Sequence, residues 1–232
     1  MAKTIITIGR EFGSYGLDIG KRVAEELGLK LYDKDMLKRA AKESGLCEEI
    51  FETHDEKPTN SFLYSLVMDT YSLGYASSGY ADMPLNHKVF LAQFDTIKKI
   101  AEEGPCVIVG RCADYALEDF DNVISIFIHA DLDKRISRIS RLHNMTPSKA
   151  KDMIVKNDKK RASYYNYYTN KEWGAAKSYD LCLDSSKLGV EGTVKAILEY
   201  VKLYEEMTPS FFTWARSQQA WYPIPILREV SG

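Results

Sequence analysis

Short apolar, β-branched runs recur along the chain, and each is followed by a loop and then by a helical pattern. The clear runs are residues 4–8, 106–109, 123–128 and 181–183, and a weaker one is residues 29–32. Strands that are apolar almost throughout and that alternate with helices are typical of a parallel sheet. The pattern therefore predicts an α/β fold in which helices cover both faces of such a sheet.

A helix is predicted directly after the first strand. Apolar side chains recur at helical spacing over residues 17–27, and Gly28 follows in the position where a left-handed residue commonly ends a helix. This helix opens out of a loop that contains several glycines.

Two segments interrupt the alternation of strands and helices. Residues 46–104 form a predicted helical insertion, with a polar stretch, an apolar segment, a Ser-Ser-Gly loop and a helix from about residue 85 to 103. A polar passage at residues 142–148 separates two helical segments rich in arginine and lysine. We interpret residues 138–162 as a mobile, positively charged lid.

The C-terminal segment predicts an interaction surface. We divide the chain into a domain of residues 1–206 and an extension of residues 207–232. The extension is too aromatic for a solvated terminus, so it must pack on its own domain or on a second subunit. We expect a homodimer to which this extension contributes contacts. Its aromatic residues are Phe211, Phe212, Trp214, Trp221 and Tyr222.

Composition narrows the class of protein. The 232 residues are 45% hydrophobic and 28% charged, which suits one sizeable core. A formal net charge of -2 gives no basic field for duplex nucleic acid. The apolar N-terminal run is too short for a signal peptide or a membrane span, so we expect a cytoplasmic protein with no membrane partner. Its four cysteines lack metal-site spacing and are expected to be reduced thiols.

The loop after the first strand predicts an anion site. It reads Gly-Arg-Glu-Phe-Gly-Ser-Tyr-Gly over residues 9–16 and leads straight into a helix. Successive backbone N–H groups in such a loop, together with a helix N-terminus, bind phosphate. The loop lacks the GxxxxGK[ST] motif, however, and Lys21 lies inside the helix rather than at its start. A tight strand-to-helix turn without a ligand is the alternative interpretation.

Several segments, taken in order, resemble the cytidylate kinase-like family, a branch of the P-loop nucleoside monophosphate kinases. The resemblance runs over about residues 4–202. The matching stretches are residues 5–14, 20–28, 31–33, 107–111, 127–138, 158–161 and 183–186. The resemblance implies a five-stranded parallel sheet with a phosphate loop around Gly13, a helical acceptor-binding insertion and a lid that carries arginines.

The resemblance also implies a role for each matched residue. Arg135, Arg138 and Arg141 match or neighbour the lid arginines that neutralise the transferring phosphoryl group, which suits a reaction driven by positioning and charge. The implied acceptor-binding residues are Arg39, Arg111, Asp158 and Arg161. The implied nucleotide-binding residues are Arg10, Phe12, Gly13, Ser14, Tyr15, Gly16 and Leu17.

Three departures from the family pattern affect the expected chemistry. Gly16 stands where classical members have the loop lysine, Leu17 and Asp18 stand at the hydroxyl position and its neighbour, and Val109 replaces a third-strand acid. Members of the branch that this chain most resembles often carry glycine at the lysine position. Lys3, Arg10 or a lid arginine could replace the lost charge, and Glu11 or Asp18 could hold a metal; the metal ligands stay open.

Three functions are consistent with these observations. The first is phosphoryl transfer from ATP or another nucleoside triphosphate, with Mg²⁺, to a small phosphorylated acceptor such as CMP. The second is a nucleotide- or anion-binding module without turnover, because the loop lysine and the third-strand acid are absent. The third is an assembly protein in which the C-terminal extension makes the relevant surface.

Overall fold

One parallel sheet organises the molecule. The computed structural model describes residues 4–33, 39, 42–43 and 85–219, with side chains as far as Met207. Within these residues five strands lie in the order β2-β3-β1-β4-β5, and every neighbouring pair is parallel. The strands are β1 (Ile5–Arg10), β2 (Lys30–Tyr32), β3 (Cys106–Val109), β4 (Val123–His129) and β5 (Leu181–Asp184). The predicted fold class is confirmed, and β1 lies at the centre.

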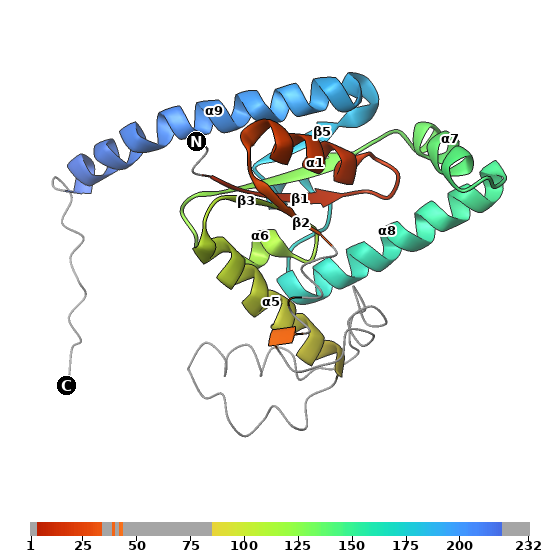
Figure 1. The fold of residues 1–232 in the computed structure, drawn as a ribbon, viewed down its shortest axis with the longest axis horizontal. Coiled ribbons are helices and arrows are strands. Elements are labelled where there is room, and N and C mark those ends of the chain that lie inside the picture. Colours follow the sequence, from red (N-terminus) through yellow and green to blue (C-terminus); the bar gives the residue numbers. More distant parts are fainter. Residues whose placement is uncertain (1–3, 34–38, 40–41, 44–84, 220–232) are drawn as a thin grey trace, which may run out of the picture.

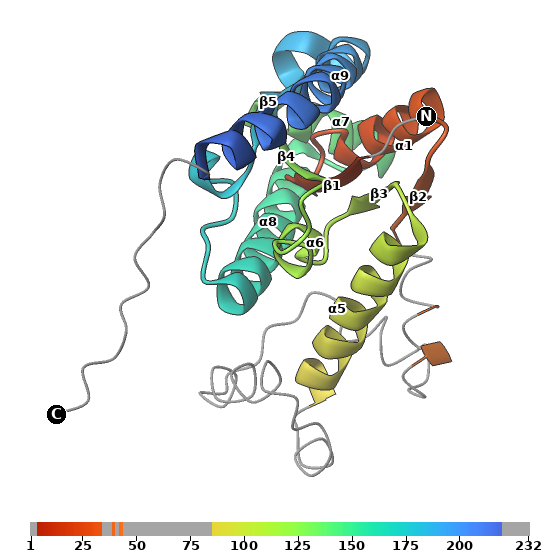
Figure 2. The same ribbon diagram turned by 90° about the vertical axis from the view of Figure 1, so that its left-hand side faces the viewer.

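Helices cover both faces of the sheet. On one face lie α1 and α9, and on the other lie α5, α6 and the C-terminal part of α8 (Figures 1 and 2). A break in α9 at Gly189, where φ is 63° and ψ is -177°, separates two helical parts. The helices are α1 (Gly16–Leu27), α5 (Leu85–Glu103), α6 (Ala113–Ala116), α7 (Leu132–Leu142), α8 (Pro147–Thr169) and α9 (Ser185–Gln219), with a short 3₁₀ turn η1 (Ala176–Ser178).

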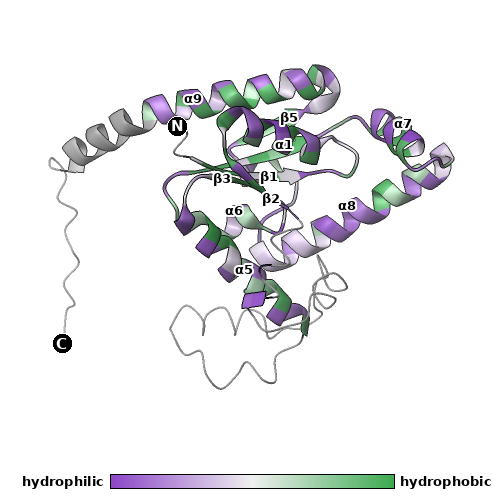
Figure 3. Cartoon of the chain, viewed as in Figure 1, coloured by the Kyte–Doolittle hydropathy of each residue, from purple (hydrophilic) through white to green (hydrophobic). Residues whose placement is uncertain are grey.

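The two faces bury separate apolar clusters. Ile19 and Val23 of α1 pack with Ile197 of α9 against one face, and Ile97 and Ile100 of α5 pack against the other. Each of these helices carries hydrophobic and hydrophilic stretches, as expected for elements that lie between core and solvent (Figure 3). This packing fixes the carboxyl ends of β1, β3 and β4 at one edge, where ligands bind in open α/β sheets.

Local chemistry sets the helix boundaries near that edge. Gly28 ends α1 in the left-handed conformation, with φ of 66°. The Asp131 carboxylate caps α7 by accepting from the amides of Asp133 and Lys134, and Thr146 caps α8. Helices α7 and α8 form a hairpin, and this hairpin contains residues 138–162, which the sequence predicts to be a lid.

The predictions outside the sheet have mixed outcomes. Helix α5 confirms the helix expected at about residues 85–103, whereas residues 44–84 of the insertion lie outside the described residues. Cys106 and Cys112 are buried thiols, and burial raises the pKa of Cys106 to about 12. Helix α9 continues to Gln219, but the aromatic side chains of the extension lie beyond the described part, and the homodimer stays a prediction.

Candidate active site

A cleft of about 590 Å³ opens at the carboxyl edge of the sheet. It lies between the loop that follows β1 and the α7–α8 hairpin, with Asp33 and Arg111 at the ends of β2 and β3. All seven residues expected to bind nucleotide line it: Arg10, Phe12, Gly13, Ser14, Tyr15, Gly16 and Leu17.

The loop after β1, residues 10–16, is held rigidly, and we call it the phosphate loop. Gly13 and Tyr15 adopt positive φ angles of 86° and 64°, which turn the chain tightly into α1. The buried Ser14 hydroxyl donates to the carbonyl oxygens of Glu11 and Ile128 at 2.9 and 3.0 Å. The first amides of α1 have no partner inside their own helix, so this end of the cleft favours an anion.

An ion pair lies beneath the phosphate loop. Arg135 Nη1 lies 2.6 Å from Asp158 Oδ2, and Asp158 Oδ1 accepts from the Phe12 amide at 2.7 Å. Arg135 also donates to the Phe12 carbonyl at 3.3 Å and to the Ala130 carbonyl at 3.0 Å. Neither side chain lines this cleft, although Arg135 lines a neighbouring cavity, and in this structure both residues hold the loop. Because the Phe12 amide is already engaged, we expect phosphate to use the amides that follow it.

Two further residues tie the phosphate loop to the sheet, and the sequence reasoning gave neither this role. Glu11 Oε2 accepts from the Ala130 amide at 2.9 Å, and its other oxygen lies 3.4 Å from Arg135 Nη2. The Ser185 hydroxyl donates to the Ser14 carbonyl at 2.8 Å. The sequence signal for Ser185 was weak: a serine that directly follows the last strand of a parallel sheet.

Arg111 reaches the cleft through a strained turn. Gly110, Arg111 and Cys112 all have positive φ, at 82°, 57° and 54°. Positive φ angles cost conformational energy for residues other than glycine, and residues held in this way concentrate at functional sites. The Arg111 side chain is buried, and its Nη1 lies 3.1 Å from Asp33 Oδ1. Asp33, for which the sequence suggested no role, thus orients this guanidinium.

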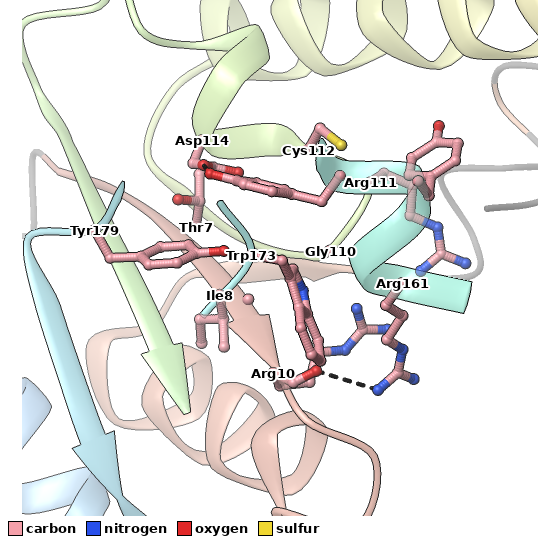
Figure 4. Close-up of a pocket in the computed structure, with 13 residues that line it drawn as sticks. Thr7, Ile8, Arg10, Gly110, Arg111, Cys112, Asp114, Arg161, Trp173 and Tyr179 are labelled. Atoms are coloured by element: carbon pink, nitrogen blue, oxygen red, sulfur yellow. Dashed lines mark hydrogen bonds between the residues drawn. The ribbon is translucent and has the colours of Figure 1, made fainter. Parts of the chain in front are cut away.

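Arg161 approaches the same place from α8. Its Nη1 donates to the Arg10 carbonyl at 3.2 Å, and its guanidinium carbon lies 5.6 Å from the centre of the Phe12 ring. Arg10, Arg111 and Arg161 lie close together in Figure 4, although they come from β1, the β3 turn and α8. Three arginines at one edge of a cleft form a strongly anion-attracting surface.

Of the two remaining lid arginines, one contacts the phosphate loop. The Arg138 guanidinium carbon lies 3.4 Å from the centre of the Tyr15 ring, and its Nη2 lies 2.6 Å from Asp18 Oδ2. Arg141 is exposed, and its Nε donates to the Ser137 carbonyl at 3.4 Å within α7. The structure thus brings Arg138 to the cleft and leaves Arg141 outside it.

Arg39 lies at the other edge of the sheet. Its guanidinium pairs with Glu103 at 2.5 Å and with Glu43 at 2.7 Å. Glu103 ends α5 just before β3 begins, so this cluster lies near the amino ends of the strands. The structure does not bring Arg39 to the other expected acceptor residues, and its assignment stays a prediction.

A small cavity of about 20 Å³ is lined in part by the same three arginines (Figure 4). Burial raises the pKa of the Asp114 carboxyl at its wall, and Tyr165 donates a hydrogen bond to this group at 2.6 Å. Tyr164, Tyr165 and Tyr168 are buried in the adjoining apolar cluster. These tyrosines therefore pack in the core.

A second cavity, of about 220 Å³, lies behind the phosphate loop. It is lined by Tyr15, Lys134, Ser186 and Gly189, among others. Gly189 belongs to the break in α9, where the chain turns after β5. This cavity and the large cleft of about 590 Å³ share Gly13 and Tyr15, so one elongated ligand could reach both.

The carboxylates in the large cleft do not form a metal cage. Within the described residues no group of three or more His, Cys, Asp or Glu side chains could hold a metal ion. Asp18 and Asp33 each pair with an arginine, as described above. Mg²⁺ commonly binds through one or two carboxylates, water and substrate phosphates, so these residues fit an ion that enters with a nucleotide.

The family follows from a match over most of the sequence. The sequence model of the cytidylate kinase-like family matches residues 5–187. This chain belongs to the cytidylate kinase-like family. The match includes every element that lines the cleft.

The described helices include none that is both long and apolar enough to cross a membrane.

Relatives and a solved structure agree with this assignment. Cytidylate kinases of Pyrococcus horikoshii and Archaeoglobus fulgidus are 24% and 26% identical, over 86% and 85% of this chain and 90% and 94% of their own lengths. A crystal structure of an uncharacterized protein from Eubacterium ventriosum is 29% identical, with a TM-score of 0.62, covering 86% of this chain and 98% of that one. The family match and the fold together place this chain among the P-loop kinases.

Proposed function

We propose that the protein transfers a phosphoryl group from a nucleoside triphosphate, carried with Mg²⁺, to a small phosphorylated acceptor. The observation that carries this proposal is the cleft of about 590 Å³, in which a phosphate loop faces Arg111 and Arg161. A site with a phosphate loop beside a cluster of arginines suits two phosphorylated substrates. Phosphoryl transfer needs little beyond their alignment and charge stabilisation.

The acceptor would bind at Arg111 and Arg161, and Arg138 would stabilise the phosphoryl group in transit. CMP is the first acceptor to test, because the two relatives described above are named cytidylate kinases. The cavity behind the phosphate loop, near Ser186 and Gly189, would receive the base of the donor.

Thermal unfolding tests the donor. A ligand at about a hundred times its Kd stabilises the native state by roughly 2.7 kcal/mol, and each kcal/mol is worth about 2 to 4 °C in a protein of this size. Millimolar ATP or GTP with Mg²⁺ should therefore raise Tm by roughly 5 to 11 °C if Kd is near 10 μM. Turnover of ATP with a panel of nucleoside monophosphates, CMP among them, then tests transfer.

A nucleotide- or anion-binding protein without turnover is the second candidate. It is favoured by one specific observation: Gly16 and Val109 stand where classical members have the loop lysine and an acid. A Tm increase with a monophosphate, without any increase from a triphosphate and without turnover, would support this candidate over the kinase.

A further inference from the structure

The side chain of Arg10 occupies the space into which a side chain at position 16 would extend. A Cβ built on Gly16 would overlap Arg10 Cβ and would lie 2.8 Å from Arg10 Cγ. Real Cβ atoms essentially never come within 3.0 Å of another heavy atom of this kind. Arg10 Cβ is fixed by the backbone of β1 and cannot move aside. Positions 10 and 16 therefore cannot both carry a side chain.

Gly110 leaves room for the other end of the same arginine. A Cβ built on Gly110 would overlap Arg10 Nη1 and would lie 3.1 Å from Arg10 Cζ. The Arg10 side chain thus crosses from the start of α1 to the turn after β3. This path brings its guanidinium beside Arg161 and the Gly110–Arg111 turn, in the cleft that the phosphate loop also lines (Figure 4).

The site needs a cation at this point. A triphosphate carries several negative charges, and the loop has no lysine at its usual position. An arginine is always charged and presents planar donors that match phosphate oxygens in pairs. Gly16 lies in α1 without a positive φ, so its backbone alone does not explain why position 16 is glycine.

We propose that the phosphate-loop cation has moved from position 16 to position 10, so that Arg10 binds the β- and γ-phosphates of the donor. This inference rests on the proposed function. The glycine at position 16 is then the partner of the arginine at position 10, and the altered loop is a rearranged donor site rather than a damaged one.

A charge-swap series tests the proposal. Arg10→Met keeps the aliphatic stem over Gly16 and removes the charge; we expect it to lower the affinity for Mg²⁺-ATP and for inorganic pyrophosphate by about 10- to 150-fold. Gly16→Lys alone should clash with Arg10 and weaken binding. Arg10→Gly combined with Gly16→Lys returns the cation to the usual position, removes the clash and should bind Mg²⁺-ATP more tightly than Arg10→Gly alone.

Calorimetric or thermal-shift titration of the folded variants gives these affinities without any need for turnover. Arg22→Ala is the matched control, because this α1 arginine pairs with Glu191 on the exposed side and should bind ATP as the parent does. Parent-like binding by Arg10→Met would overturn the proposal. So would a folded double variant that binds no better than Arg10→Gly alone. Failure of the parent itself to bind any triphosphate would instead refute the proposed function.

Discussion

Arg135 and Asp158 form an ion pair beneath the phosphate loop, with 2.6 Å between Nη1 and Oδ2. The pair joins α7 to α8, and Asp158 also holds the Phe12 amide. The side chains are only 9% and 18% exposed, so the pair is largely removed from water. The ion pair therefore connects the phosphate loop to both helices of the hairpin.

Asp158→Ala should destabilise the protein and weaken donor binding. Removing one partner of a buried ion pair lowers the free energy of unfolding by about 3 kcal/mol, which corresponds to a Tm lower by roughly 6 to 12 °C. Because the Phe12 amide also loses its acceptor, we expect a smaller Tm increase from Mg²⁺-ATP. Differential scanning calorimetry with and without ATP measures both effects.

Glu191→Ala is the control for this variant, because its ion pair with Arg22 is exposed and should contribute at most about 1 kcal/mol. If Asp158→Ala instead keeps the parent Tm and ATP affinity and loses only acceptor affinity, Asp158 is an acceptor ligand and not a support of the loop.

Arg111→Ala should weaken acceptor binding more than Arg39→Ala does. Loss of a charged hydrogen bond costs about 1.5 to 3 kcal/mol, so the Kd of the acceptor should rise about 10- to 150-fold for Arg111→Ala, and similarly for Arg161→Ala. Arg39 pairs with Glu43 and Glu103 at the opposite edge of the sheet. Calorimetric titration with the acceptor found in the turnover panel measures all three variants.

If the Arg39 and Arg111 variants lose acceptor affinity equally, Arg39 must take a different position when the acceptor is bound. No loss in the Arg111 and Arg161 variants would remove the proposed acceptor site.

The sheet could be predicted from the sequence because each strand is an uninterrupted apolar run. Residues 106–109 were placed correctly as β3, and Gly28 correctly ended α1, since both depend on local composition and backbone conformation. The cleft followed from topology, because the carboxyl ends of parallel strands meet at one edge.

The contacts inside the cleft could not be predicted in the same way. Asp158 and Arg135 are 23 positions apart, and their pairing depends on how α7 packs against α8. The exclusion of a side chain at Gly16 by Arg10 needs the three-dimensional path of the loop. A sequence pattern shows that the lysine is missing, but only the structure shows which side chain lies in its space.

Removal of the C-terminal extension should change the oligomeric state. The aromatic side chains after Met207 would expose several hundred Å² of apolar surface if unpacked, more than a monomer usually tolerates. We expect the full chain to be a homodimer and a chain truncated after Met207 to lose mass or solubility. Light scattering and the melting temperature of the two chains test this. A soluble truncated chain with unchanged association and Tm would contradict it.

Gly13→Ala and Gly28→Ala provide a matched pair of glycine substitutions for the phosphate loop. Both residues have positive φ, at 86° and 66°, so each alanine costs about 1 to 2 kcal/mol of backbone strain. A Cβ at Gly28 would meet nothing within 4 Å. A Cβ at Gly13 would lie 3.2 Å from Ile139 Cγ1 and 3.3 Å from Arg135 Cβ.

The two variants should therefore lose similar stability from strain but differ in ligand binding. Gly28→Ala should lower Tm by about 2 to 8 °C and keep the full Tm increase from pyrophosphate and Mg²⁺-ATP. Gly13→Ala presses on Ile139 and Arg135, which shifts the loop away from the position that binds phosphate, so its Tm increase from both ligands should be much smaller. Thermal unfolding with each ligand measures this, and equal increases in the two variants would place the phosphate site outside the loop.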